Sequence, residues 1–384
     1  MPLTVLDRVN LAWIWTRSVW PEYRRWRRPR GRVGSGPKVY YGYEQVPGPE
    51  DMAFGGIVKV QDLQSQFPNE PSGANILYLV SSALPHFAVR MAAMARRAGA
   101  RVVVNQNGVA YPGWHGPGWE KTNRSMRRLH DMADYVFYQS DFCRKSAKRF
   151  LGERTGPSEI LHNPVDTEAF VPLGNITDMT NGPRLLLSGS HWSFYRVETA
   201  LRTLALLHQP MPQARLLVAG RFCWGDDPDQ ARRQVLATAD SLGLQDRLSL
   251  IGPYPQTQAA GVLQAADILL HTKYNDPCPR LVVEAMACGL PVVYSASGGV
   301  SELVGEKAGI GIPAPMDWEM DHPPDPRKLA EAVRNIWTRY REYSLAARNR
   351  AVEHLDVRPW ARRHEAVFQR LVQEHSRERK RHGN

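Results

Sequence analysis

The stretch NDPCPRLVVEAMACGLP, residues 275–291, decides the fold of this chain. From Leu281 to Cys288 every residue except Glu284 is apolar, a pattern that predicts a helix buried on all sides. Asp276 lies eight residues before Glu284, on the other side of the expected helix start. One carboxylate therefore precedes the buried helix and a second lies within it.

The carboxylate of Glu284 has two explanations. Burying a lone carboxylate in an apolar helix is costly unless hydrogen bonds are donated to it, and the hydroxyls of a bound ribose would donate them. Alternatively Arg280, four residues earlier on the same helix face, forms an ion pair with it. Spacing alone favours neither explanation.

The start of this helix is suited to an anion. The backbone amides of Arg280, Leu281 and Val282 are expected to be free, and the helix dipole favours negative charge there, so a diphosphate is the natural occupant. Gly298 and Gly299, after the next apolar strand, form a second such element, because backbone without Cβ atoms can approach a ligand closely.

Outward from this stretch, strand-like and helix-like segments alternate, which predicts βαβ units and parallel sheets. The expected strands of a first domain are 39–43, 76–80, 101–105, 135–139 and a short one at Ile160. Those of a second domain are 185–187, 215–219, 248–251, 268–271 and 291–294. Residues 174–183 are rich in turn formers and predict an interdomain linker. Two consecutive parallel-sheet domains imply a ligand cleft between them, at the carboxyl ends of the strands.

The net charge of +11 is concentrated at the two ends of the chain. Residues 1–38 carry nine Arg and Lys against two acids, and residues 358–384 carry eight against three, so the 319 residues between them are nearly neutral. This distribution argues against nucleic acid as a partner, because a domain that binds nucleic acid carries its basic residues on the folded surface.

The length of 384 residues allows two separate cores. No apolar run near the N-terminus reaches the roughly 18 to 20 residues that cross a bilayer, and no secretory signal is visible. The four cysteines contain no CxxC motif, so we expect free thiols and a cytoplasmic location.

EAMACGLPVV, which begins at Glu284, and SGGVSELV, which begins at Ser297, resemble the donor-binding core of the family 4 glycosyltransferases. The resemblance covers about residues 38–375 and implies the GT-B fold, an α/β architecture of two Rossmann-like parallel-sheet domains facing a central cleft. It implies transfer of a sugar from a nucleotide-sugar donor to an acceptor hydroxyl, with retention of configuration. It further implies no metal and no cofactor beyond a UDP- or GDP-linked co-substrate.

We expect the chain to divide into four segments. They are a basic N-terminal extension (1–37), an acceptor domain (38–173), a donor domain (174–357), and a C-terminal helix and basic tail that cross back to the acceptor domain (358–384).

The family brackets its donor with an acidic residue and a glutamate separated by seven positions. The resemblance therefore implies that Asp276, where the family more often has Glu, touches the sugar hydroxyls and that Glu284 touches the ribose. It also places Gly189 at the end of the first strand of the donor domain. The positions where the family's backbone contacts the nucleobase are Gly252, Pro253 and Tyr254.

The chain departs from the family at its phosphate-binding cations. An Arg and a Lys of the family are replaced by Ser190 and Tyr195. We expect Arg196 to hold the donor phosphates instead, since a guanidinium binds two phosphate oxygens at once; an ordinary helix-surface cation is the alternative. This loss also leaves open a catalytically degenerate GT-B protein that acts as a binding or scaffold module.

In the first domain, Gly55 and Gly56 match a glycine pair that brings backbone close to the donor phosphate or the acceptor, although a plain helix N-terminus explains them equally well. Asn107 replaces a family His; it hydrogen-bonds a sugar hydroxyl but cannot accept a proton. His86 is a further candidate, though such a His is more often structural. Asp227 is expected to cap a helix rather than to hold a metal.

The N-terminal extension contains Trp13, Trp15, Trp20 and Trp26 beside the Arg cluster of residues 24–32. Trp and Arg together are typical of an interfacial membrane anchor. One hypothesis is peripheral binding to anionic membrane at its inner face, with a glycan or lipid-linked acceptor. The other is a solvated extension, either loose or wrapped on the domain.

Overall fold

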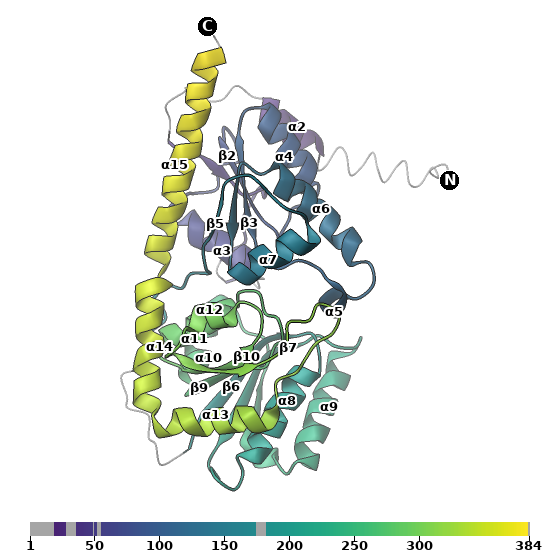
Figure 1. Cartoon of the computed structure of the whole chain (residues 1–384), viewed down its shortest axis with the longest axis vertical. Coiled ribbons are helices and arrows are strands. Elements are labelled where there is room, and N and C mark those ends of the chain that lie inside the picture. The colour runs from purple at the N-terminus through teal and green to yellow at the C-terminus, as the bar shows by residue number, and fades with distance from the viewer. Residues whose placement is uncertain (1–18, 28–35, 49, 52–54, 174–181, 383–384) are drawn as a thin grey trace, which may run out of the picture.

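The computed structural model describes residues 19–27, 36–48, 50–51, 55–173 and 182–382. These residues form two α/β domains, one above the other in Figure 1, and each is built on a parallel sheet. The predicted fold class is therefore confirmed. Of the expected linker, residues 174–181 lie outside the described part of the chain.

The N-terminal domain has a five-stranded sheet in the order β1-β2-β3-β4-β5. Its strands are β1 (Val39–Tyr40), β2 (Ile76–Val80), β3 (Arg101–Gln106), β4 (Tyr135–Tyr138) and β5 (Ser158–Ile160). Its helices are α2 (Trp20–Arg27), α3 (Gly55–Gln64), α4 (Ala88–Arg97), α5 (Pro112–His115), α6 (Trp119–Met132) and α7 (Asp141–Phe150). Every residue of β2 and β4 is buried, because helices cover both faces of the sheet.

The C-terminal domain has a six-stranded sheet in the order β11-β10-β9-β6-β7-β8. Its strands are β6 (Arg184–His191), β7 (Arg215–Phe222), β8 (Leu248–Ile251), β9 (Ile268–His271), β10 (Val292–Ala296) and β11 (Gly309–Pro313). Its helices are α8 (Tyr195–Leu206), α9 (Pro228–Ser241), η3 (Gln245–Arg247), η4 (Gln256–Gln258), α10 (Ala259–Gln264), α11 (Arg280–Ala287), α12 (Val300–Val304), α13 (Pro326–Thr338) and α14 (Tyr340–His354). The expected cap is confirmed, since the Asp227 side chain accepts from the amide of Asp229 at the start of α9.

The last helix, α15 (Val357–His382), leaves the C-terminal domain and runs along the N-terminal one (Figure 1). Trp360 and Phe368 are buried in the N-terminal core beside Tyr78. His364 Nε2 lies 3.0 Å from the Tyr78 hydroxyl, and burial lowers the pKa of this histidine to about 3. The helix therefore ties the two domains together through buried aromatic packing.

Part of the expected N-terminal extension folds onto the domain. Trp26 on α2 is buried in the N-terminal core, and Arg25 pairs with Glu22 and Glu44. Segment 20–27 is thus packed on the domain, whereas Trp13 and Trp15 lie outside the described residues. In the described part of the chain, no helix is both long enough and apolar enough to cross a membrane.

Strands β6 and β7 both run longer than predicted, and their backbones approach each other closely at Gly220. It has a φ of +101°, and a Cβ atom there would lie 2.0 Å from the carbonyl oxygen of Gly189. We expect Gly220→Ala to lower the free energy of unfolding by about 2 to 3 kcal/mol, measured by urea denaturation.

Gly261, at an exposed position of α10, is the matched control, since none of the described residues places a heavy atom within 4 Å of its Cβ position. Gly261→Ala should leave the stability unchanged or raise it by up to ~1 kcal/mol. Equal stability of the two variants would contradict the close backbone approach at Gly220.

Candidate functional site

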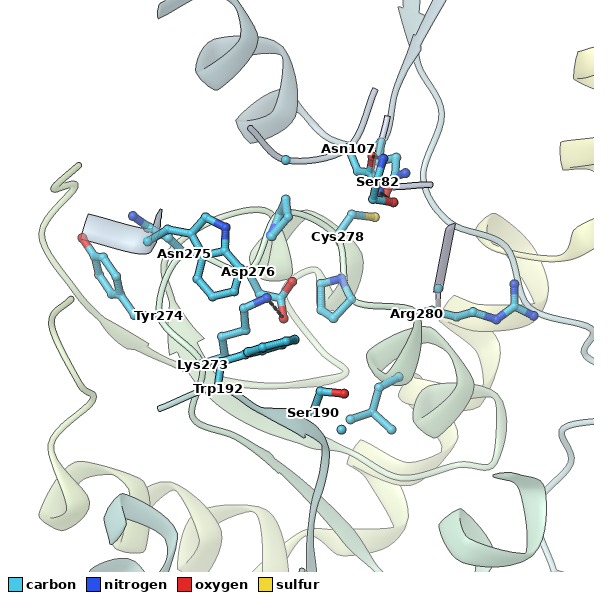
Figure 2. A pocket seen from close by; sticks show the side chains of 18 of the residues that line it. Ser82, Asn107, Ser190, Trp192, Lys273, Tyr274, Asn275, Asp276, Cys278 and Arg280 are labelled. Carbon is cyan, nitrogen blue, oxygen red and sulfur yellow. Dashed lines mark hydrogen bonds and ion pairs between the residues drawn. The ribbon is translucent and has the colours of Figure 1, made fainter. Parts of the chain in front are cut away.

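A cavity of about 620 Å³ lies between the two domains. Its N-terminal wall comes from the start of α3 and the loop after β3, and its C-terminal wall comes from the ends of β6 and β9 and the start of α11. Figure 2 shows Ser82 and Asn107 on one side of it and Ser190 and Trp192 on the other. The cavity therefore lies at the carboxyl ends of strands, where a parallel-sheet protein binds its ligands.

Asp276 is the buried carboxylate of this cavity, with 8% of its surface exposed. Its Oδ2 lies 3.1 Å from Lys273 Nζ and 3.2 Å from His271 Nε2. Burial raises the pKa of Asp276, but the Lys273 ammonium and then His271 outweigh burial and hold this pKa well below its ordinary value. Asp276 is thus ionised at neutral pH and accepts hydrogen bonds.

Lys273 is a cavity residue that sequence reasoning missed. Its side chain is 23% exposed, and its Nζ lies 5.4 Å from the ring centroid of Trp114. Figure 2 shows it beside Asp276. Its position two residues after the apolar strand β9 could have identified it, because charged residues near the carboxyl end of a buried strand tend to face a cleft.

Arg196 is the second residue of α8 and lines the cavity, although only 6% of its surface is exposed. Its Nη1 donates to the carbonyl oxygen of Ser190 at 2.9 Å, and its Nε is buried with no hydrogen-bond partner among the described residues. Ser190 and Gly189 line the same wall. The hydroxyl of Tyr195 accepts from the amide of Tyr274 at 3.1 Å, so this tyrosine is engaged in the wall.

For Glu284, the structure shows the ion pair that spacing left open. Arg280 Nε donates to Glu284 Oε1 at 2.7 Å, and Gln256 Nε2 donates to the same oxygen at 2.8 Å. Arg280 also pairs across the domain boundary with Asp62 on α3. Arg280 lines the cavity, whereas Glu284 does not. The expected contact of Glu284 with ribose stays a prediction, and it requires these bonds to rearrange.

Leu281 also lines the cavity, but Val282 does not. The amide of Val282 donates to the carbonyl oxygen of Pro279 at 3.2 Å, so the helix start offers the amides of Arg280 and Leu281 rather than three.

Gly298 and Gly299 lie against the protein's own backbone, and the close approach to a ligand that was expected of them stays a prediction. Cβ atoms at these positions would lie 2.3 Å from the carbonyl oxygen of Asp276 and 2.1 Å from that of Pro277. The amide of Gly299 donates to the Asp276 carbonyl at 2.8 Å. The two glycines therefore let the loop after β10 pack against the Asp276 segment, and neither lines the cavity.

The three residues expected at the nucleobase also lie outside the cavity wall; they are Gly252, Pro253 and Tyr254. The Tyr254 hydroxyl lies 2.7 Å from Ser188 Oγ, a cavity residue. The carbonyl of Gly252 accepts from the Gly220 amide at 3.2 Å, so this turn is fixed by its neighbouring strand. Their contact with a base stays a prediction.

In the N-terminal wall, Asn107 is held by two neighbouring serines. Its Oδ1 accepts from the amide of Ser82 at 3.1 Å and from the Ser81 hydroxyl, and its Nδ2 donates to the Ser82 hydroxyl. Gly55 and Gly56 line the same wall, and a Cβ atom at Gly56 would lie 2.7 Å from Ser82 Oγ. His86 is exposed and does not line the cavity.

A second contact joins the domains beside the cavity. Glu302 on α12 accepts from the amides of Asp141 at 2.7 Å and Phe142 at 3.1 Å, at the start of α7, and lies 3.3 Å from His162 Nε2. Burial raises the pKa of Glu302, but His162 and these amides outweigh burial and lower it overall. The negative charge of Glu302 therefore stabilises the start of α7, where the helix dipole is positive.

Residues 181–342 match the family model of the glycosyl transferases group 1. The D-inositol 3-phosphate glycosyltransferase of Mycobacterium leprae (strain Br4923) is 38% identical over 186 residues, which cover 45% of this chain and 41% of that protein. The corresponding protein of Corynebacterium jeikeium (strain K411) is 32% identical over 126 residues, which cover 32% and 30%. The chain thus spans less than half the length of these curated relatives.

Two solved structures share the fold. Sucrose-phosphate synthase from Thermosynechococcus elongatus has a TM-score of 0.64 at 18% identity and covers 82% of this chain and 77% of its own. HepE from Anabaena, in complex with UDP and glucose, has a TM-score of 0.60 at 19% identity and covers 81% of both chains. The GT-B architecture is confirmed by these matches.

The Glu302 contact predicts a pH-dependent contribution to stability. We expect Glu302→Gln to lower the free energy of unfolding by about 1 kcal/mol at pH 7, because the glutamine side chain brings no negative charge to the start of α7. Since the folded-state pKa lies below the ordinary 4.5, the difference is fully present above about pH 4.5 and disappears as the pH falls through the folded value. Denaturation curves from pH 3 to 7 measure it.

Glu306→Gln, at an exposed position shortly after α12, is the control and should change stability little at any pH. A Glu302→Gln effect that is independent of pH would rule out the charge as its origin.

Proposed function

We propose that this chain, whose residues 181–342 form a group 1 glycosyl transferase domain within a GT-B fold, transfers a sugar from a nucleotide-sugar donor to an acceptor hydroxyl. The observation that carries the proposal is the ionised carboxylate of Asp276, held by Lys273 and His271 in an interdomain cavity beside the start of α11. HepE, which shares the fold, was solved with UDP and glucose, and this supports a nucleotide-linked sugar as donor.

The donor's diphosphate is proposed to lie at the C-terminal wall. The amides of Arg280 and Leu281 have no partner within their own helix, and the positive end of the helix dipole adds to their attraction for an anion. Arg196 and Lys273 supply positive charge to the same wall, where Ser190 and Tyr195 supply none.

In the proposed reaction, the sugar hydroxyls donate to Asp276, which fixes the sugar relative to its leaving group. As the bond from the anomeric carbon to the diphosphate oxygen breaks, negative charge grows on that oxygen. The nearby cations and amides stabilise this charge in a site partly shielded from water. We infer attack by the acceptor on the same face, with retention of configuration and without a metal, from the family resemblance.

The acceptor is proposed to enter from the N-terminal wall. Asn107 is oriented by Ser81 and Ser82, so its amide presents a fixed hydrogen-bonding group to an acceptor or sugar hydroxyl. An amide does not take up the acceptor's proton, which in this proposal passes to the departing phosphate oxygen. A glycan or lipid-linked molecule is the acceptor class that we propose.

The test is release of nucleoside diphosphate from a panel of UDP-, GDP-, TDP- and ADP-sugars. We expect activity with one member, and Asp276→Asn should lower kcat by about 100-fold or more, because the neutral amide no longer orders the sugar hydroxyls. Asp131→Asn, on the exposed face of α6, is the control and should keep full activity. No turnover with any donor, combined with tight nucleotide binding, would favour the binding-module alternative instead.

A second prediction concerns the phosphate-binding cation. Arg196→Ala should weaken the binding of the matching nucleoside diphosphate about 10-fold in calorimetry, because a charge-assisted hydrogen bond is lost. Arg202→Ala, on the same helix but paired with Glu198 at the surface, should bind normally. Unchanged affinity for the nucleoside diphosphate in the folded Arg196→Ala protein would contradict a phosphate-binding role of Arg196.

A further inference from the structure

Lys59 is a buried cation in the N-terminal wall of the cavity. It lies in the second turn of α3, only 3% of its surface is exposed, and it lines the cavity. Its Nζ donates to Asn105 Oδ1 at 3.1 Å. An ammonium carries three hydrogens, so two remain for other acceptors.

Among the residues that the structure describes, no carboxylate forms an ion pair with Lys59. Asp62 attracts its charge without an ion pair, and is itself paired with Arg280. A buried charge without an ion-pair partner is costly, and burial accordingly lowers the pKa of Lys59 to about 7. A ligand anion in the cavity would supply the missing countercharge.

The surroundings of Lys59 provide hydrogen-bond donors rather than acceptors. Gln139 also lines the cavity, and its Nε2 donates to the same Asn105 Oδ1 at 2.7 Å. The acceptors of this group are the side-chain oxygens of Asn105 and Gln139, and that of Asn105 is already shared by two donors. Within the described part of the chain, the Nδ2 of Asn105 is buried with no hydrogen-bond partner, so the group has more donors than acceptors. A ligand that accepts several hydrogen bonds and carries negative charge fits this group, and a phosphoryl group does both.

The start of α3 faces the same cavity through Gly55 and Gly56. Among the described residues, no heavy atom lies within 4 Å of a Cβ atom at Gly55, so the backbone there leaves space for a ligand. The positive end of the α3 dipole adds to the positive potential around Lys59.

We propose that Lys59 and Gln139 form a phosphoryl-binding subsite on the N-terminal wall of the cavity. The subsite rests on the proposed transferase function for its substrate. Two sources of the phosphoryl group share this chemistry, namely the diphosphate of the donor and a phosphate carried by the acceptor. In the first case the N-terminal domain closes on the leaving group, and in the second it selects a phosphorylated acceptor.

The experiment compares the full-length protein with Lys59→Met, which keeps the length of the side chain and removes its charge. Lys121→Met, at an exposed position on α6, is the matched control. Calorimetry measures the affinity of the nucleoside diphosphate that binds wild-type protein, and the affinity of the corresponding nucleoside. Inorganic phosphate is then titrated into each protein, first alone and then with the nucleoside diphosphate at saturation.

If the donor supplies the group, Lys59→Met weakens the diphosphate at least 10-fold and leaves the nucleoside unchanged. If the acceptor supplies it, diphosphate affinity is unchanged, and inorganic phosphate binds the saturated wild-type protein but not Lys59→Met. Normal affinity for both ligands in Lys59→Met, or a loss of phosphate binding that Lys121→Met shares, would overturn the proposal.

The proposed function fails separately. A protein that binds no nucleoside diphosphate would contradict the transferase, yet the titration with inorganic phosphate alone still tests Lys59. Because Lys59→Met removes an uncompensated buried charge, we expect thermal unfolding at the same temperature as wild type or higher. Lys59→Arg serves as a second variant: it restores the charge and should recover part of the lost affinity.

Discussion

The site depends on how the backbone of Asp276 and Pro277 is held at the domain boundary. The Asp276 carbonyl accepts from the Gly299 amide, and the Pro277 carbonyl accepts from the Ser140 hydroxyl of the other domain at 2.6 Å. Both contacts require residues without side chains opposite them, which Gly298 and Gly299 provide. With its backbone fixed in this way, Asp276 stands between Lys273 and His271 as a charged acceptor rather than a neutral acid.

Charges on the two sides of this segment set the distance between the cavity walls. Arg280 reaches Asp62 on α3, and Glu302 accepts from the start of α7. Burying such groups costs desolvation that offsets much of their attraction, so these contacts fix the relative orientation of the domains more than they add to stability. The helix α15 contributes the apolar part of the connection by packing on the N-terminal core. Ligand binding that breaks the ion pair between Arg280 and Asp62 would therefore change the contact between the two domains.

Sequence patterns predicted the elements that are apolar and bounded by turns. The ranges of β2, β8 and β9 agree with the structure residue for residue, whereas β11 was missed because its sequence GIGIP has the glycines and proline of a turn. Within the site, the apolar pattern placed Asp276 shortly before a buried helix, which is α11. It could not choose between partners for Glu284, because several donors lie within reach only in three dimensions. Lys59 was missed because a single lysine in an ordinary helix carries no local signal, whereas Lys273 was missed although it closely follows the buried strand β9. At Gly298 and Gly299, which were expected to lie close to a ligand, the atoms that approach most closely in the structure belong to the protein's own backbone.

The central claim is that a nucleoside diphosphate binds between the domains, against the end of β6 and the start of α11. Hydrogen exchange of the full-length protein, with and without the nucleoside diphosphate that binds it, tests this claim most directly. We expect slower exchange on binding in residues 187–192 and 275–282, with smaller changes in helices α9 and α13, which do not line the cavity. Binding without protection in either segment, or protection confined to another part of the chain, would contradict it.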